Sequence, residues 1–85
     1  MTAENVGEKL ENGRTIVAIE TDYPGADTAT ILAVGAGQAA PWVTWRAKNV
    51  DGAWVCSSGD YEFTFADAVA SFQTRAEWNV KAANA

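Results

Sequence analysis

The sequence contains no histidine and only one cysteine, which rules out several common kinds of functional site. Without histidine there is no imidazole for acid–base catalysis and no Cys–His metal site. Cys56 has no second cysteine for a disulfide within the chain and no histidine to activate it as a nucleophile. A lone cysteine is typical of a protein kept in a reducing compartment, so we expect a cytoplasmic location.

Basic residues are also scarce: six Lys and Arg stand against eleven Asp and Glu, for a formal charge of −5. Because phosphate contacts need clustered cations, this balance disfavours nucleic-acid binding. No apolar run is long enough to span a membrane, and the polar N-terminus lacks the apolar core of a secretory signal. We expect no membrane association.

What the chain has in abundance is aromatic residues, with four Trp, three Phe and two Tyr among 85 residues. A chain of this length forms one domain, and large aromatic side chains help a small core to reach sufficient volume. We expect a single domain over residues 1–85, with 1–5 and 80–85 frayed.

Residues 41–56 carry the strongest pattern, two β-rich runs around Asp51-Gly52, a dipeptide typical of tight hairpin turns. With that turn, Asn49 lies opposite Trp54, Ala47 opposite Cys56 and Trp45 opposite Ser58. Because side chains alternate along a strand, one face of the hairpin is expected to form core and the other to be mixed. The expected core face holds Val43, Trp45, Ala47, Trp54 and Cys56; the mixed face holds Trp42, Thr44, Arg46, Lys48, Ala53, Val55 and Ser57.

Two further strands are predicted at 14–21 and 28–34, where β-branched residues are frequent. Residues 5–11 fit a short strand slightly better than a helix, ending at the Asn12-Gly13 turn signal. The glycines of 35–40 follow a strand but precede Pro41 and another strand, so they predict a hairpin loop and not a dinucleotide-binding loop. Residues 57–60 indicate a turn or bulge, followed by an extended piece at 61–63.

The hydrophobic period then changes to that of a helix. Thr64 is the expected N-cap, and the helix is predicted to run to about Trp78. Its apolar stripe is Phe65, Ala68, Val69, Phe72 and Ala76, whereas Asp67, Ser71, Arg75 and Glu77 lie away from it. The predicted fold is therefore α+β: a small antiparallel sheet, a meander of about four strands, with one C-terminal amphipathic helix packed on one face.

One helix covers only one face of a sheet, yet the first two strands are apolar on both. Strict alternation points Val17 and Ile19 one way and Ile16 and Ala18 the other. In the second strand, it points Leu32 and Val34 one way and Ile31 and Ala33 the other. The second face must be covered by another copy of the chain, by the N-terminal segment, or by a partner protein. A homodimer through this face is one of our expectations.

Catalytic chemistry finds little support, and we expect neither an enzyme nor a cofactor. Asp60 and Glu62 could share a face, but an exposed acidic pair at a turn is the favoured interpretation. Cys56 is expected to be a small buried hydrophobe. The best binding constellation combines aromatic, basic and apolar side chains of the sheet, and we predict an interaction face formed by Trp42, Thr44, Arg46, Lys48, Val55, Ile16 and Ile31.

Part of the chain resembles small uncharacterised proteins encoded by phages and other mobile elements of actinobacteria. The resemblance covers the C-terminal half and is carried by Val43-Thr44-Trp45, Asp51-Gly52, Ser58-Gly59-Asp60-Tyr61-Glu62-Phe63 and residues 65–75. It implies an accessory protein that acts in the host cytoplasm on a host protein. We therefore expect a small, non-enzymatic protein that works by protein–protein interaction; the alternative is a nucleic-acid-associated regulator using the aromatic and basic face.

Overall fold

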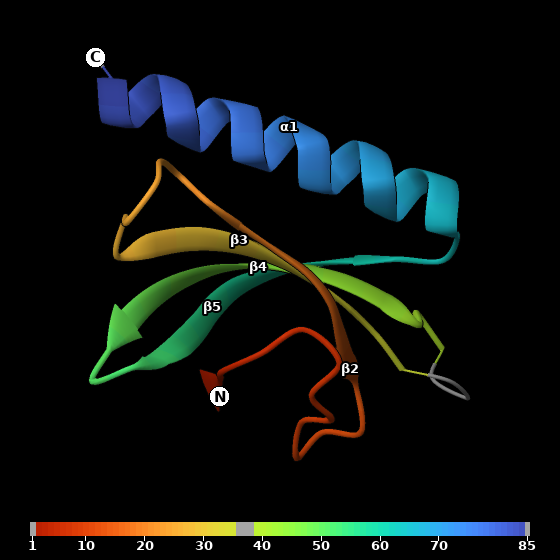
Figure 1. Ribbon diagram of the computed structural model, residues 1–85. Coiled ribbons are helices and arrows are strands. Elements are labelled where there is room, and N and C mark those ends of the chain that lie inside the picture. The colour runs from red at the N-terminus through yellow and green to blue at the C-terminus, as the bar shows by residue number, and fades with distance from the viewer. Residues whose placement is uncertain (1, 36–38, 85) are drawn as a thin grey trace.

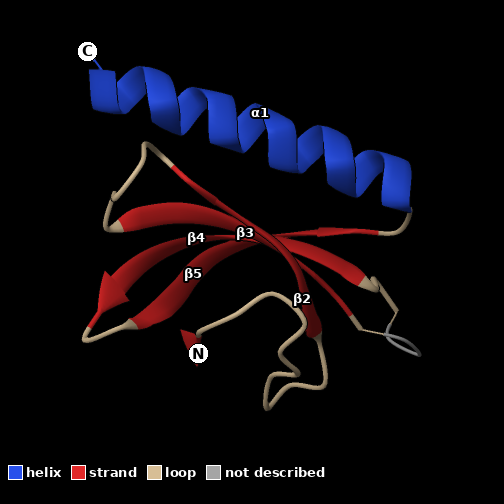
Figure 2. Cartoon of the chain, viewed as in Figure 1, coloured by secondary structure: helices blue, strands red, loops and turns tan. Residues whose placement is uncertain are grey.

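The computed structural model describes residues 2–35 and 39–84, apart from the side chains of Ser58 and residues 77–84 (Figure 1). It is an antiparallel sheet in the order β1-β5-β4-β3-β2 with one C-terminal helix, which confirms the α+β class (Figure 2). The described sheet has five strands where about four were expected. The elements are β1 (Thr2–Ala3), β2 (Thr15–Thr21), β3 (Thr28–Val34), β4 (Trp42–Val50), β5 (Ala53–Glu62) and α1 (Phe65–Asn84).

The central hairpin of β4 and β5 turns at the predicted dipeptide. Asp51 and Gly52 both have positive φ, 53° and 89°, as a two-residue type I′ turn requires. The predicted pairs Asn49–Trp54 and Ala47–Cys56 are present, so this part of the register is confirmed. On the other side of β4, the backbone N–H of Gly35 donates to the Pro41 carbonyl (2.7 Å), closing the β3–β4 hairpin; residues 36–38 of the expected glycine loop lie outside the described residues.

A β-bulge interrupts each of the two longer outer strands. In β5 the pairing shifts beyond Ser57, so that Asp60 lies opposite Thr44; the turn or bulge expected at 57–60 is a bulge within one strand. In β2 the shift falls between Ile16 and Ala18. Bulges bend a strand and increase its twist, and this sheet is visibly curled (Figure 1).

The hydrophobic core occupies the concave face of the curled sheet. Val43, Trp45 and Ala47 are buried there, with Trp54 and Cys56 partly buried against them, so the predicted core face of the hairpin is confirmed. The β2 bulge changes the expected alternation, because Ile16 and Ile19 both belong to this core while Val17 is 38% exposed. The other core members are Ala3, Leu10, Ile31 and Ala33.

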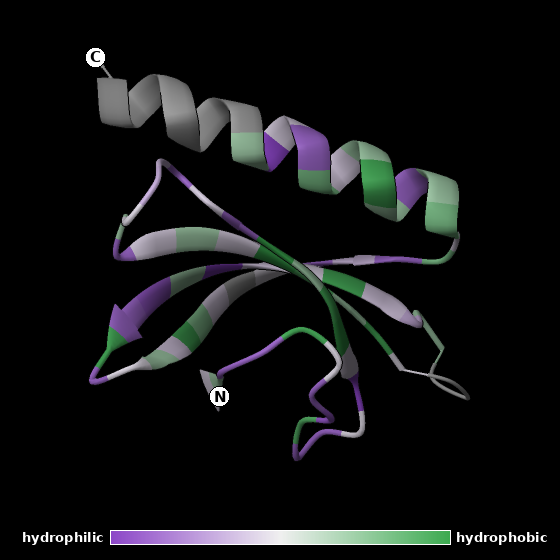
Figure 3. Cartoon of the chain, in the orientation of Figure 1, coloured by the Kyte–Doolittle hydropathy of each residue, from purple (hydrophilic) through white to green (hydrophobic). Residues whose placement is uncertain are grey.

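The N-terminal segment covers this core and joins the two edges of the sheet. Ala3 pairs with Trp54 on the β5 side, whereas Gly7 donates its N–H to the Ile16 carbonyl (2.8 Å) on the β2 side. Residues 2–3 form β1, within the stretch expected to fray. The expected strand at 5–11 is wrong, because these residues are irregular chain with a single bridge at Lys9. The segment is mostly hydrophilic and contributes few residues to the core (Figure 3).

Helix α1 lies across the opposite face of the sheet (Figure 1). Its N-cap is confirmed, since the Thr64 hydroxyl accepts a hydrogen bond from the N–H of Asp67 (3.2 Å). The predicted end was wrong: the helix continues past Trp78 to Asn84, so residues 80–84 are helical.

The predicted orientation of α1 was also wrong for three residues. Ser71 and Arg75 face the sheet, where the Arg75 guanidinium donates to the Thr44 carbonyl (2.9 Å). Phe65, expected on the buried stripe, is 58% exposed, although Ala68 is fully buried as expected. The physical reason is the polar residue Thr44 in the middle of β4, which polar helix residues can satisfy and apolar ones cannot.

Candidate functional site

The predicted interaction face is divided between the two sides of the sheet. Ile16 and Ile31 are 1% and 0% exposed in the core, so neither offers a surface to a partner in this fold. Trp42 and Thr44 lie on the other side, beneath α1. The Trp42 ring packs on Phe65 with centroids 5.0 Å apart, and Thr44 is buried against Arg75.

Arg46, the central cation of that predicted face, forms an ion pair with Asp22. Its two terminal nitrogens lie 3.2 and 3.1 Å from the two Asp22 carboxylate oxygens, and it also donates to the Ala29 carbonyl (2.9 Å). Burial alone would raise the pKa of Asp22, but hydrogen bonds from Arg46 and Thr28 and the guanidinium charge outweigh it and lower the pKa. Through this ion pair, Arg46 on β4 holds the turn that follows β2.

Only two members of the predicted face remain open. Lys48 and Val55 are exposed and lie opposite each other on β4 and β5. One cation and one valine do not make a surface that could stack bases or anchor a protein.

Arg14 has a structural role that the sequence analysis missed. It is buried, and its guanidinium donates to the carbonyls of Pro41 (2.6 Å) and Ala40 (3.0 Å). The same guanidinium lies 5.2 Å from the centre of the Tyr61 ring, a cation–π geometry. The sequence could not have predicted this role of Arg14, because the curl of the sheet brings together residues that are far apart in the chain.

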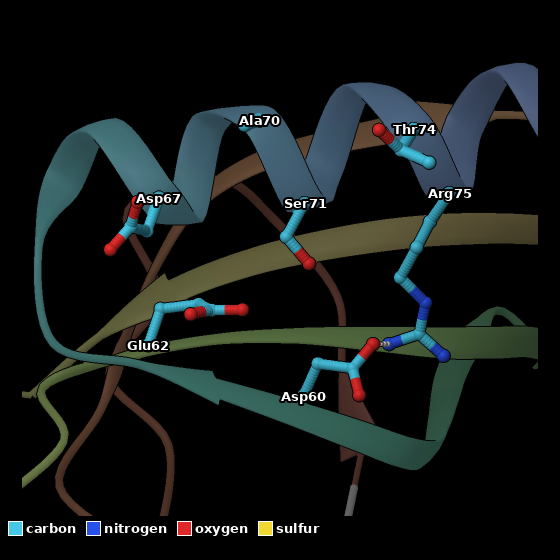
Figure 4. A pocket seen from close by; sticks show the side chains of 7 residues that line it. All are labelled: Asp60, Glu62, Asp67, Ala70, Ser71, Thr74 and Arg75. Atoms are coloured by element: carbon cyan, nitrogen blue, oxygen red, sulfur yellow. Dashed lines mark ion pairs between the residues drawn. The ribbon is translucent and has the colours of Figure 1, made fainter.

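An open depression of about 400 Å³ lies between β5 and α1 (Figure 4). Asp60 and Glu62 share its strand side, and they lie within β5 and not at the turn that the favoured interpretation gave them. Arg75 reaches down from α1 and its guanidinium lies 3.2 Å from the Asp60 carboxylate. The depression is lined by Asp60, Glu62, Asp67, Ala70, Ser71, Thr74 and Arg75.

The residues that line this depression differ from those of a typical catalytic or small-molecule pocket. Small-molecule and catalytic pockets are usually concave and largely apolar, whereas here Ala70 is the one apolar lining residue. Within the described part of the chain, no three His, Cys, Asp or Glu residues are placed to hold a metal ion.

Next to the depression, three aromatic side chains are exposed at alternate positions along the end of β5 and the start of α1. Tyr61, Phe63 and Phe65 are 56%, 73% and 58% exposed; we call this set the aromatic junction. Tyr61 pairs with Val43 and so lies on the concave side, whereas Phe65 contacts Trp42 on the helix side. The sequence analysis missed this site because it assigned Phe65 to the buried stripe.

Cys56 packs against the core, as predicted, and is half-buried. Burial raises the pKa of its thiol, which disfavours the nucleophilic thiolate. The geometry therefore gives no support to a reactive cysteine.

In the described residues, no helix is both long enough and apolar enough to cross a membrane. Comparison of the chain with protein families, with curated proteins and with solved structures found no match.

Proposed function

We propose that this chain is a non-enzymatic protein that acts by binding another protein through the aromatic junction. The observation that carries the proposal is the exposure of Tyr61, Phe63 and Phe65 within five consecutive residues. Single exposed apolar residues are normal on a protein surface. Three exposed aromatic rings within five residues are a higher density, and they favour an interface at this end of β5 even though Tyr61 and Phe65 lie on different sides of the sheet. Aromatic side chains are also enriched among the residues that dominate binding energy.

The alternative, a nucleic-acid-associated regulator, has less support. It requires Trp42 and Arg46 to be available to bases and phosphates. The Trp42 ring packs on Phe65, and the Arg46 guanidinium is paired with Asp22. The acidic balance of the chain also repels phosphate.

The partner that we propose is a different protein and not a second copy of this chain. A second copy of the chain was one of three covers expected for the second apolar face of the sheet, and in this fold the N-terminal segment, another of the three, lies over that face. If the resemblance to phage accessory proteins reflects its origin, the partner is a host protein met in the host cytoplasm.

The test is quantitative affinity capture with variants of the aromatic junction. Phe63→Ser removes the most exposed aromatic ring among the described side chains, and Tyr23→Ser is the matched control because Tyr23 is a half-exposed aromatic in the turn after β2. We expect a protein captured by the wild type and by Tyr23→Ser to be lost with Phe63→Ser. Equal capture by all three chains would contradict the proposal.

A further inference from the structure

The N-terminal segment is held to the sheet unequally at its two ends. The end beside β2 makes backbone hydrogen bonds over residues 7–10, and Leu10 is buried there. These bonds run from the Gly7 N–H to the Ile16 carbonyl (2.8 Å), from the Ile16 N–H to the Glu8 carbonyl (2.9 Å) and from the Leu10 N–H to the Arg14 carbonyl (2.7 Å). Because the bonded residues are close in sequence, little loop-closure entropy opposes this end.

The end beside β5 is held by less. Strand β1 is two residues long and meets β5 through the pairs Thr2–Val55 and Ala3–Trp54. Ala3 is fully buried, but its side chain is a single methyl group, and β5 is far away in sequence. A short ladder with little buried apolar area is typical of a segment that opens locally while the rest of the fold stays intact.

Residues 4–6 link the two ends and are exposed. Oε1 of Glu8 accepts hydrogen bonds from the backbone N–H groups of Glu4 (2.7 Å) and Asn5 (3.2 Å). The Glu8 carboxylate therefore ties the link to the part of the segment that is bound beside β2. A second depression, of about 240 Å³, lies between Thr2 and residues 8–11, so the two ends can move separately.

The weakly held end covers apolar side chains of β5. Trp54 pairs with Ala3, and Cys56 lies two residues further along β5, on the same side of the strand. Both side chains are partly buried against the core to which Ala3 belongs. Moving β1 away from β5 would expose them to solvent without breaking the bonds beside β2.

From this asymmetry we propose that residues 2–6 form a lid that opens at β1 while residues 7–10 stay bound beside β2. The closed lid buries the β5 part of the core, and the open lid presents Trp54 and Cys56 as an apolar surface. The Glu8 carboxylate favours the closed state. The chain can thus hide or present this surface without unfolding. This inference goes beyond the proposed function and uses no residue of the aromatic junction, so the two can fail independently.

A reversible disulfide tests the lid. Thr2 and Val55 are exposed and lie opposite each other, and the Cα atoms of such pairs are about 4.5–5.5 Å apart, within the span of a disulfide. In a Cys56→Ser background, Thr2→Cys with Val55→Cys closes the lid covalently when oxidised and releases it when reduced. Amide hydrogen exchange followed by NMR compares the two forms of this one chain, at the protected amides of β1 and of its partner residues in β5.

We expect oxidation to slow exchange at these amides about tenfold or more, because exchange there requires the open lid. The amides of Gly7 and Leu10 should change by less than about twofold relative to Asn49, whose N–H donates to the Asp27 carbonyl (2.7 Å) outside the segment. Equal slowing at Gly7 and Leu10 would mean that the whole segment opens as one unit. No slowing at β1 would mean that β1 does not open separately. Either result would overturn the inference.

The role of Glu8 is tested by the same measurement in the chain with its native cysteine. Glu8→Ala removes the acceptor of the Glu4 and Asn5 amides and should speed exchange at β1 about tenfold. Glu8→Gln keeps a side-chain oxygen as acceptor and should stay within about twofold of the wild type. Glu11→Ala is the matched control, because Glu11 is an exposed carboxylate of the same segment. Equal exchange rates for Glu8→Ala and Glu11→Ala would show that the Glu8 carboxylate does not hold the lid closed.

Discussion

At the scale of single residues, the three arginines act as links between segments that are distant in sequence. Arg14 joins the start of β2 to the chain before β4, and Arg46 joins β4 to the turn after β2. Arg75 joins α1 to β4 and β5. Each guanidinium has several donors in a fixed plane and can satisfy several acceptors at once, which suits a small domain with little apolar area to bury.

The Asp22–Arg46 link gives a prediction for stability and its pH dependence. Asp22→Asn should lower the free energy of unfolding by about 2 kcal/mol at neutral pH, because it leaves the Arg46 guanidinium without a counter-charge. Since folding lowers the pKa of Asp22, this stabilisation is fully present above the ordinary value of 3.8 and is lost as the pH falls through the folded-state pKa.

Urea denaturation of the wild type and Asp22→Asn across the acid range measures this difference. The two chains should converge in stability at low pH. The exposed neighbour Asp27 provides the control, because Asp27→Asn makes the same chemical change where the side chain is open to solvent. A constant gap between wild type and Asp22→Asn down to the lowest pH would show that the carboxylate charge is not the cause.

Gly59 gives a second prediction, because it lies where β5 passes close to a core tryptophan. A Cβ at this position would lie 2.9 Å from Nε1 of Trp45, whose side chain is almost fully buried. Gly59→Ala should therefore destabilise the fold by about 1–3 kcal/mol, whereas the exposed Ser57→Ala should be nearly neutral. In a Trp45→Phe background the penalty at Gly59 should shrink, and denaturation of the double-mutant cycle would reveal this coupling. If Gly59→Ala costs the same stability in both backgrounds, the steric conflict is not with Trp45.

At the scale of elements, helix α1 is defined by its start more than by its hydrophobic stripe. The Thr64 cap and Asp67 in the first turn fix where it begins. Its contact with the sheet is partly polar, through Ser71 and Arg75 on Thr44. A helix docked in this way depends on register, because a shift of one residue would take Arg75 away from its acceptors.

The cap can be tested directly. Thr64→Ala should cost about 1 kcal/mol, because the N–H of Asp67 loses its acceptor, and Thr64→Ser should be close to neutral. Thermal melts followed by circular dichroism compare the two variants. Equal melting temperatures for the alanine and serine chains would mean that the hydroxyl at 64 does not hold the helix start.

Local patterns predicted the elements whose causes are local. The Asp51-Gly52 turn, the β3 and β4 strands and the Thr64 cap are set by neighbouring residues, and they were found where the sequence indicated. The side of α1 that faces the sheet was predicted wrongly, because an argument from hydrophobic periodicity assumes that the sheet surface beneath the helix is apolar. Thr44 makes part of that surface polar. The position of the N-terminal segment over the core was not predicted, because its hydrogen bonds join it to β2 and β5, which are distant in sequence. Such bonds produce no periodic pattern of apolar residues.

The candidate site was less predictable than the fold. The common face of Asp60 and Glu62 follows from alternation, so the strand side of the depression could be anticipated. The exposure of Phe63 and Phe65 could not, because the helical period places Phe65 on the apolar stripe and predicts that it is buried. Only the position of α1 over the sheet shows that they are left outside.

At the scale of the whole molecule, a single sheet has both faces covered by its own chain. Helix α1 lies over one face, and the N-terminal segment closes the concave one. The domain is thereby able to bury apolar residues on two sides of β3 without a partner: Ile31 lies in the core, and Leu32 is buried on the helix side.

This arrangement predicts opposite outcomes for adjacent substitutions in β2. Ile16→Glu should unfold the chain, because it buries an unpaired carboxylate in the core of a small domain. Val17→Glu should fold normally, because the bulge turns that residue outward. Far-UV circular dichroism and sedimentation would distinguish the cases. A folded monomer from Ile16→Glu, smaller than the wild-type species, would instead restore the dimer interface predicted from the sequence.

The two bulges also bear on how the protein avoids sticking to itself. An outer strand with free backbone groups is a template on which other chains can polymerise into fibrils. Here the N-terminal segment occupies one end of each outer strand, and a bulge breaks the next part, leaving only residues 18–21 and 60–62 uninterrupted. Such short stretches are poor seeds for fibril growth. The fold therefore leaves little of either outer strand free to pair with the backbone of another chain.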